Sequence, residues 1–115
     1  MLSLLIMKYK NTIHRGSVRI VVFREANEWY ATALEFNIVE SGSTPQEAML
    51  LVFEAIRGYV ESAKKVKARP YILNQSVDRE YEAMWRAGAE SKRQNESIFF
   101  AGRMNIADRR SLIPA

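Results

Sequence analysis

The sequence predicts an α+β fold, in which a three- to four-stranded, largely antiparallel sheet has a long helix packed on one face and a second helix in the C-terminal half. Three short segments within residues 18–42 are rich in β-branched and aromatic side chains, which favour strands. Residues 45–65 then place apolar side chains at helical spacing behind a clear capping signal. The length of 115 residues is that of one domain.

The first two strands are predicted to form a hairpin. Residues 18–25 alternate, so that one face carries Val18, Ile20 and Val22 and the other carries Arg19, Val21 and Phe23. Asn27 tolerates a positive φ angle, which favours a tight turn before residues 29–34 return as the second strand. After a break at residues 35–37, residues 38–42 are predicted to form a third strand.

The long helix is predicted to begin at Pro45. Thr44 can cap it, and Glu47 completes a capping box, with the proline at the first helical position, where its missing N–H does no harm. Four apolar residues widen the hydrophobic surface of this helix beyond the stripe that would face the sheet. Either the C-terminal segment or a second copy must cover them, so they are the candidates for an oligomer interface: Met49, Leu50, Phe53 and Val60.

The second half of the chain is predicted to contain one more helix and one or two short strands. Pro70 ends the long helix, and Tyr71–Leu73 is a candidate fourth strand. A second helix is predicted from Arg79 to about Ser91. Ile98–Ala101 is interpreted as a strand or a docking segment.

The predicted elements and the charge both divide the chain. We expect a β-β-β-α-β domain over residues 1–75, then a helix and basic tail over residues 76–115 that belong to the same domain or form an appendage. Residues 64–115 hold eleven Lys/Arg against six Asp/Glu, whereas residues 1–63 hold six against seven. An anionic partner would therefore meet the C-terminal half, although a solvated tail explains the charge equally well. The nucleic-acid-binding candidates are Arg69, Arg79, Lys92 and Arg93.

Aromatic residues among the basic ones offer a second sign of nucleic-acid binding. Their spacings favour packing in a core or a dimer over stacking on bases. This prediction covers Tyr59, Tyr71, Tyr81 and Trp85.

Residue types that support catalysis are scarce in this sequence. It has no cysteine and a single histidine, His14, with no acid close to it in sequence. No triad, metal cluster or phosphate-binding glycine loop can be proposed, so we expect no enzyme activity, no metal and no cofactor. The apolar start Met1–Met7 is much shorter than the roughly 20 residues of a membrane span. We expect a soluble, cytoplasmic protein.

The stretch Glu28–Ala48 resembles the central signature of HicB-like antitoxins. An aromatic pair and small residues lead through a short turn to a third strand, and a Glu-Ala pair then opens a long helix that ends near a tyrosine. The residues that carry the resemblance are Gly42, Ser43, Thr44, Glu47, Ala48 and Tyr59. The match covers about residues 16–65. The resemblance implies a partial ribonuclease-H-like fold without nuclease acids, and binding that neutralises a HicA-type mRNA-cleaving toxin.

Three functions are compatible with these features. The first is a HicB-like antitoxin, which would bind a small basic ribonuclease toxin through complementary acids on the sheet segment. The candidates for this contact are Glu25, Glu28, Glu35 and Glu40. The second is an orphan homo-oligomeric scaffold without a toxin partner. It is suggested by the wide apolar surface of the long helix, which a second copy of the chain would cover. The third is a transcriptional repressor that uses the basic C-terminal half, although residues 66–115 match neither a helix-turn-helix nor a ribbon-helix-helix pattern.

Overall fold

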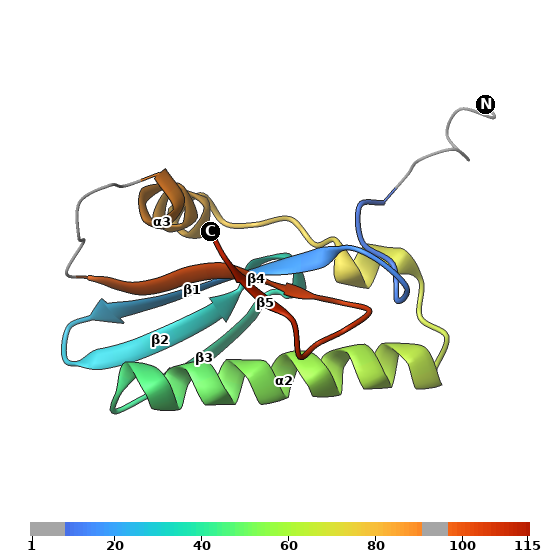
Figure 1. Cartoon of the computed structure of the whole chain (residues 1–115), viewed down its shortest axis with the longest axis horizontal. Coiled ribbons are helices and arrows are strands. Elements are labelled where there is room, and N and C mark those ends of the chain that lie inside the picture. Colours follow the sequence, from blue (N-terminus) through green and yellow to red (C-terminus); the bar gives the residue numbers. More distant parts are fainter. Residues whose placement is uncertain (1–8, 91–96) are drawn as a thin grey trace.

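The computed structural model describes residues 9–90 and 97–115, which form a five-stranded antiparallel sheet between two helices (Figure 1). The strands lie in the order β3-β2-β1-β4-β5. The predicted α+β class is confirmed, with more strands than expected. The elements in chain order are β1 (Ser17–Glu25), β2 (Glu28–Ala33), the 3-10 helix η1 (Leu34–Phe36), β3 (Ile38–Gly42), α2 (Pro45–Lys65), the 3-10 helix η2 (Pro70–Leu73), α3 (Arg79–Glu90), β4 (Ile98–Asn105) and β5 (Leu112–Pro114).

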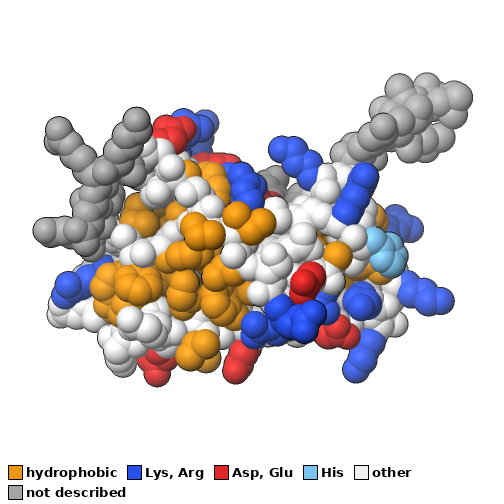
Figure 2. All heavy atoms as spheres, viewed as in Figure 1, with side chains coloured by type: hydrophobic (Ala, Val, Ile, Leu, Met, Phe, Trp, Pro, Cys, Tyr) orange, Lys and Arg blue, Asp and Glu red, His pale blue; other side chains and the backbone are white. Residues whose placement is uncertain are grey.

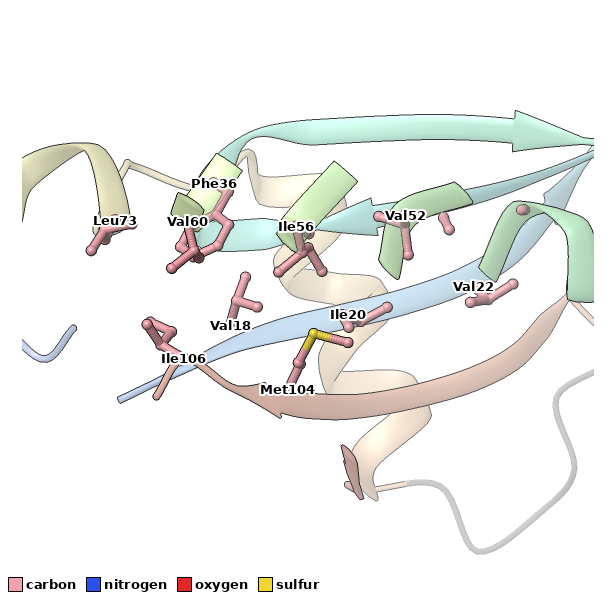
Figure 3. Close-up of a cluster of buried hydrophobic side chains, with 13 residues drawn as sticks. Val18, Ile20, Val22, Phe36, Val52, Ile56, Val60, Leu73, Met104 and Ile106 are labelled. Atoms are coloured by element: carbon pink, nitrogen blue, oxygen red, sulfur yellow. The ribbon is translucent and has the colours of Figure 1, made fainter. Parts of the chain in front are cut away.

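The central strand β1 supplies side chains to a core on each face of the sheet, as its alternation predicts. Val18, Ile20 and Val22 are fully buried in the larger core, under α2 (Figure 3). Val21 and Phe23 point to the opposite face, where they pack with Leu34 and with Trp85 of α3. A strand that is buried on both faces needs apolar residues at nearly every position, and β1 has them.

The start of α2 has the capping box that its sequence predicts. The Thr44 hydroxyl accepts a hydrogen bond from the Glu47 backbone N–H at 3.1 Å. The Glu47 carboxylate accepts in return from the Ser43 backbone N–H at 2.6 Å, one residue before the cap. Such a cap contributes about 1 kcal/mol, so it fixes where the helix begins more than whether the protein folds.

The predicted strand at Tyr71–Leu73 is wrong, because these residues belong to η2. Their carbonyl groups are engaged by side chains instead of by a neighbouring strand. The Tyr59 hydroxyl donates to the Ile72 carbonyl at 2.7 Å, and the Asn11 amide donates to the Leu73 carbonyl at 2.9 Å. The expected segment at residues 98–101 is a strand, β4, which pairs with β1.

Val60 cannot belong to an oligomer interface, in contrast to the prediction. Its side chain is 0% exposed in the larger core, where Figure 3 shows it beside Phe36. The sequence pattern places Val60 outside the stripe that faces the sheet, but Leu73 of η2 and Ile106 after β4 belong to the same core. These residues come from segments that follow the helix in sequence, so helical periodicity alone could not reveal them.

Two helical glycines give opposite expectations for alanine. A Cβ atom at Gly58 of α2 would have nothing within 4 Å, whereas one at Gly88 of α3 would lie 2.9 Å from the Ala101 Cβ atom. Gly58→Ala should therefore raise the free energy of unfolding by about 0.5–1 kcal/mol, through helix propensity. Gly88→Ala should lower it, because overpacking typically costs about 1–3 kcal/mol. Urea unfolding followed by circular dichroism measures both, and equal stabilisation by both variants would contradict the packing of α3 on β4.

Candidate partner-binding surface

The four glutamates predicted to contact a toxin do not form one acidic surface. Glu25 and Glu28 face each other across the β1–β2 turn and are exposed. Glu35 follows the far end of β2, a strand of six residues and thus about 20 Å long, and Glu40 lies in β3. Of the four, only Glu25 and Glu28 are neighbours at an exposed site.

Glu35 is held by Arg19 of β1 and is not free for a partner. The Arg19 Nε atom donates to Glu35 at 2.5 Å, and the Arg19 backbone N–H donates to the same carboxylate at 2.8 Å. The guanidinium also makes two hydrogen bonds to Glu82 of α3, at 2.6 and 2.9 Å. It lies over the Trp85 ring as well, 5.5 Å from the centroid. Arg19 therefore joins β1, η1 and α3.

The charges of this network perturb one another. Burial alone would lower the pKa of Arg19, but the hydrogen bonds from its guanidinium to Glu82 and Glu35 outweigh burial and raise it. The hydrogen bond from Arg19 lowers the pKa of Glu82 against a smaller opposing effect of burial. Both shifts show that the charged forms of Arg19 and Glu82 are stabilised in the folded chain.

A polar cavity of about 350 Å³ opens beside the Arg19 network, next to the loop before β1. The side-chain amides of two asparagines in its wall form hydrogen bonds within the protein. Asn11 donates to the Leu73 carbonyl and accepts from the Ser17 backbone N–H, and Asn74 bonds both the N–H and the carbonyl of Asn11. These amides attach the loop to η2, so we interpret this wall as structural.

A group of partly buried apolar side chains borders the larger core where the sheet extends past α2. We call it the apolar strip. The helix packs mainly against β1, β2 and β3. On the same face of β4, Met104 is buried in the larger core, whereas Phe100 is only partly buried. Figure 2 shows hydrophobic side chains gathered there, beside the N-terminal half of α2. The strip consists of Trp29, Met49, Phe53, Phe99, Phe100 and Leu112.

A β-bulge directs Phe99 into the strip. The pairing of β1 with β4 shifts between Val22 and Phe23, whose partners are Phe100 and Ile98, so Phe99 has no partner of its own. A bulge changes the alternation of side chains, and the Phe99 ring meets the Trp29 ring edge-on at 6.1 Å. Phe99 remains 46% exposed.

Two of the four residues predicted for an oligomer interface belong to the strip, and a third, Leu50, lies beside them on α2. Met49 and Phe53 are partly buried against the larger core, and the Arg57 guanidinium lies over the Phe53 ring at 6.0 Å. Leu50 is 64% exposed and is a helical neighbour of Phe53. Their role in an oligomer interface stays a prediction. The sequence also predicts a strand or docking segment at residues 98–101, without showing which face these residues occupy.

The nucleic-acid candidates are dispersed. Arg69 precedes η2 and Arg79 begins α3, both exposed, while Lys92 and Arg93 lie outside the described residues. Among the four aromatic residues expected to pack, Tyr71 does not, because it is 58% exposed.

Comparison with protein-family models, curated proteins and solved structures finds no match to this chain. Within residues 9–90 and 97–115, no group of three His, Asp or Glu side chains is placed to hold a metal ion. None of the described helices has both the length and the apolar composition of a membrane span.

The ion pair of Glu82 should make stability depend on pH. Because its pKa lies below the ordinary 4.5 in the folded chain, its stabilising effect is present above pH 4.5 and disappears as the pH falls through the lowered value. Glu82→Gln should therefore reduce the free energy of unfolding at neutral pH. The loss should be no more than about 1 kcal/mol, because the side chain is 38% exposed, and should vanish in acid.

Thermal unfolding at several pH values measures this difference. Glu80→Gln is the control, since Glu80 lies on the same helix and has no ion pair within the described part of the chain. A loss that is independent of pH, or is equal in the two variants, would contradict the role of the Arg19 pair.

Proposed function

We propose that this chain is a non-catalytic binding protein of the HicB-like antitoxin type, which binds a HicA-type mRNA-cleaving toxin and covers its RNA-binding surface. The apolar strip is the observation that carries the proposal. The segment with the resemblance, Glu28–Ala48, also supports it, since it forms β2, β3 and the capped start of α2 as one continuous unit.

The strip has the composition of a protein-binding surface. Four of its six residues are aromatic: Trp29 of β2, Phe53 of α2, and Phe99 and Phe100 of β4. Large apolar patches on soluble proteins commonly mark interaction sites, and aromatic anchors supply much of the binding energy at interfaces. Binding of this kind requires only that the toxin surface be covered, so it requires no catalytic residue on this chain.

Charge would assist the encounter from one end of the strip. Glu28 directly precedes Trp29, and Glu25 is its partner across the turn. Both are exposed, so they can attract a small basic toxin and make the association rate sensitive to salt. Of the four acids selected from the sequence, this proposal keeps these two. It leaves out Glu35, which is paired with Arg19, and Glu40, which is partly buried on β3.

The test is capture of a HicA-type ribonuclease, such as a small basic protein encoded by an adjacent reading frame. Phe99→Ser should weaken co-purification by more than about ten-fold and abolish growth rescue, because it removes an anchor ring. Val39→Ser is the matched control, since Val39 is 44% exposed on β3 and pairs with Thr32, which faces away from α2. Equal losses in the two variants, or no capture by the parent, would contradict the proposal.

A second copy of the chain is the competing occupant of the strip. Leu50 favours this alternative, because it adds a strongly exposed apolar side chain on the outer side of α2. In that case sedimentation should show a dimer that Leu50→Asp converts to a folded monomer, since a buried unpaired charge opposes association. A parent chain that sediments as a monomer would exclude the homo-oligomeric scaffold. Leu50 suits this test better than Phe53, whose ring also packs against the core.

A further inference from the structure

We propose that the end of the molecule where α2 stops binds single-stranded nucleic acid, through its phosphate backbone and one stacked base. This surface, the basic end, lies at the opposite end of α2 from the helix N-terminus that borders the apolar strip, and its function is additional to toxin binding. It consists of five cations and one aromatic residue: Arg15, Lys64, Lys65, Lys67, Arg69 and Tyr71.

The five cations are exposed, and none of them forms an ion pair with any residue in the described ranges 9–90 and 97–115. The nearest acid of α2 in sequence, Glu61, is already paired with Arg109 at 2.9 Å. Figure 2 shows Lys and Arg side chains gathered at this end. The loop that carries Arg15 is attached to η2 through Asn11 and Asn74, so the segments belong to one surface.

Lys67 occupies a backbone position where lysine is unfavourable. Its φ angle is +52°, in the left-handed region. The Ala68 N–H reaches the Ala63 carbonyl at 2.9 Å and the Lys67 N–H reaches the Lys64 carbonyl at 3.2 Å, as in a Schellman motif. That position is usually glycine, since other L-residues lose stability there. A lysine at this position provides an exposed positive charge at the cost of local stability, which points to a role for the charge.

Tyr71 is the one described tyrosine in this region whose ring is left open. The residue is 58% exposed, although hydrogen bonds fix the backbone around it. Pro70 precedes it, the Asn74 N–H donates to the Tyr71 carbonyl at 3.0 Å, and Tyr59 holds Ile72. An exposed aromatic ring on a fixed backbone, surrounded by cations that can bind phosphates, is an arrangement on which single-stranded bases stack.

A purely structural explanation accounts for part of this surface. Lys64 and Lys65 lie in the last turn of α2, where cations interact favourably with the helix dipole. The dipole explains neither Arg15 nor Arg69, which lie outside the helix, nor the exposed ring of Tyr71. It also does not explain a lysine at a left-handed position. A duplex partner would leave Tyr71 without a role, since paired bases do not offer their faces.

Fluorescence anisotropy of the full chain tests the proposal, with labelled single-stranded RNA, single-stranded DNA of the same sequence, and the corresponding duplex. From about 50 to 200 mM salt, affinity for the single strands should fall steeply, and a triple variant K64Q/K65Q/R69Q should reduce the slope of log affinity against log salt by about 2. The matched control R24Q/R57Q/R86Q removes three exposed cations elsewhere and should leave the slope unchanged.

Two single variants separate stacking and charge from folding. Tyr71→Ala should weaken single-strand binding by about five-fold to more than a hundred-fold, and Tyr71→Phe by less than two-fold, because the ring remains. Lys67→Gly should raise the urea midpoint while it weakens binding. The proposal fails if the parent does not bind at low salt, if it binds the duplex as tightly, if the two triple variants behave alike, or if Tyr71→Ala has no effect. The RNA and DNA probes then identify which of the two strands is preferred.

Discussion

The burial of β1 on both faces is the constraint on which the rest of this structure depends. A central strand without a solvent face must be covered by a helix on each side and paired along both edges. The chain meets this requirement with α2, α3, β2 and β4. Arg19 is the one charged residue within the buried stretch of β1, and carboxylates from η1 and α3 converge on it. Because β1 supplies side chains to both cores and also carries Arg19, the same strand explains why Glu35 is held in an ion pair.

The parts of the fold that depend on neighbouring residues could be predicted from the sequence. The hairpin turn, the Thr44–Glu47 cap and the start of α3 involve groups within a few positions of one another. The reason given for the turn was wrong, because Ala26 and not Asn27 has the positive φ angle. The place of β4 depends on contacts with β1, about 80 positions earlier in the chain, and the conformation of residues 71–73 depends on Tyr59 and Asn11. Single-sequence patterns do not contain such long-range partners.

The sequence identified candidate site residues by their chemical type, but not where the fold places them. Acidic residues near the hairpin were recognisable, but only the three-dimensional structure separates Glu25 and Glu28 from Glu35. Phe99 illustrates the same limit. Strict alternation would place Phe99 and the next residue, Phe100, on opposite faces, and the bulge brings both rings to the side that faces α2. Bulges have no reliable sequence signature, so the aromatic surface could be found only from the structure.

The short edge strand β5 determines how a partner can approach. The Ala115 and Asn105 N–H groups bond across to Ala101 and Ser111, so the odd-numbered residues of β5 face β4 and the N–H positions of Leu112 and Pro114 face outward. Proline has no N–H to donate, so a strand added at this edge would find a single donor from β5. Extension of the sheet by a strand of another protein is therefore disfavoured at this edge. This favours partners that bind through side chains on the face of the sheet.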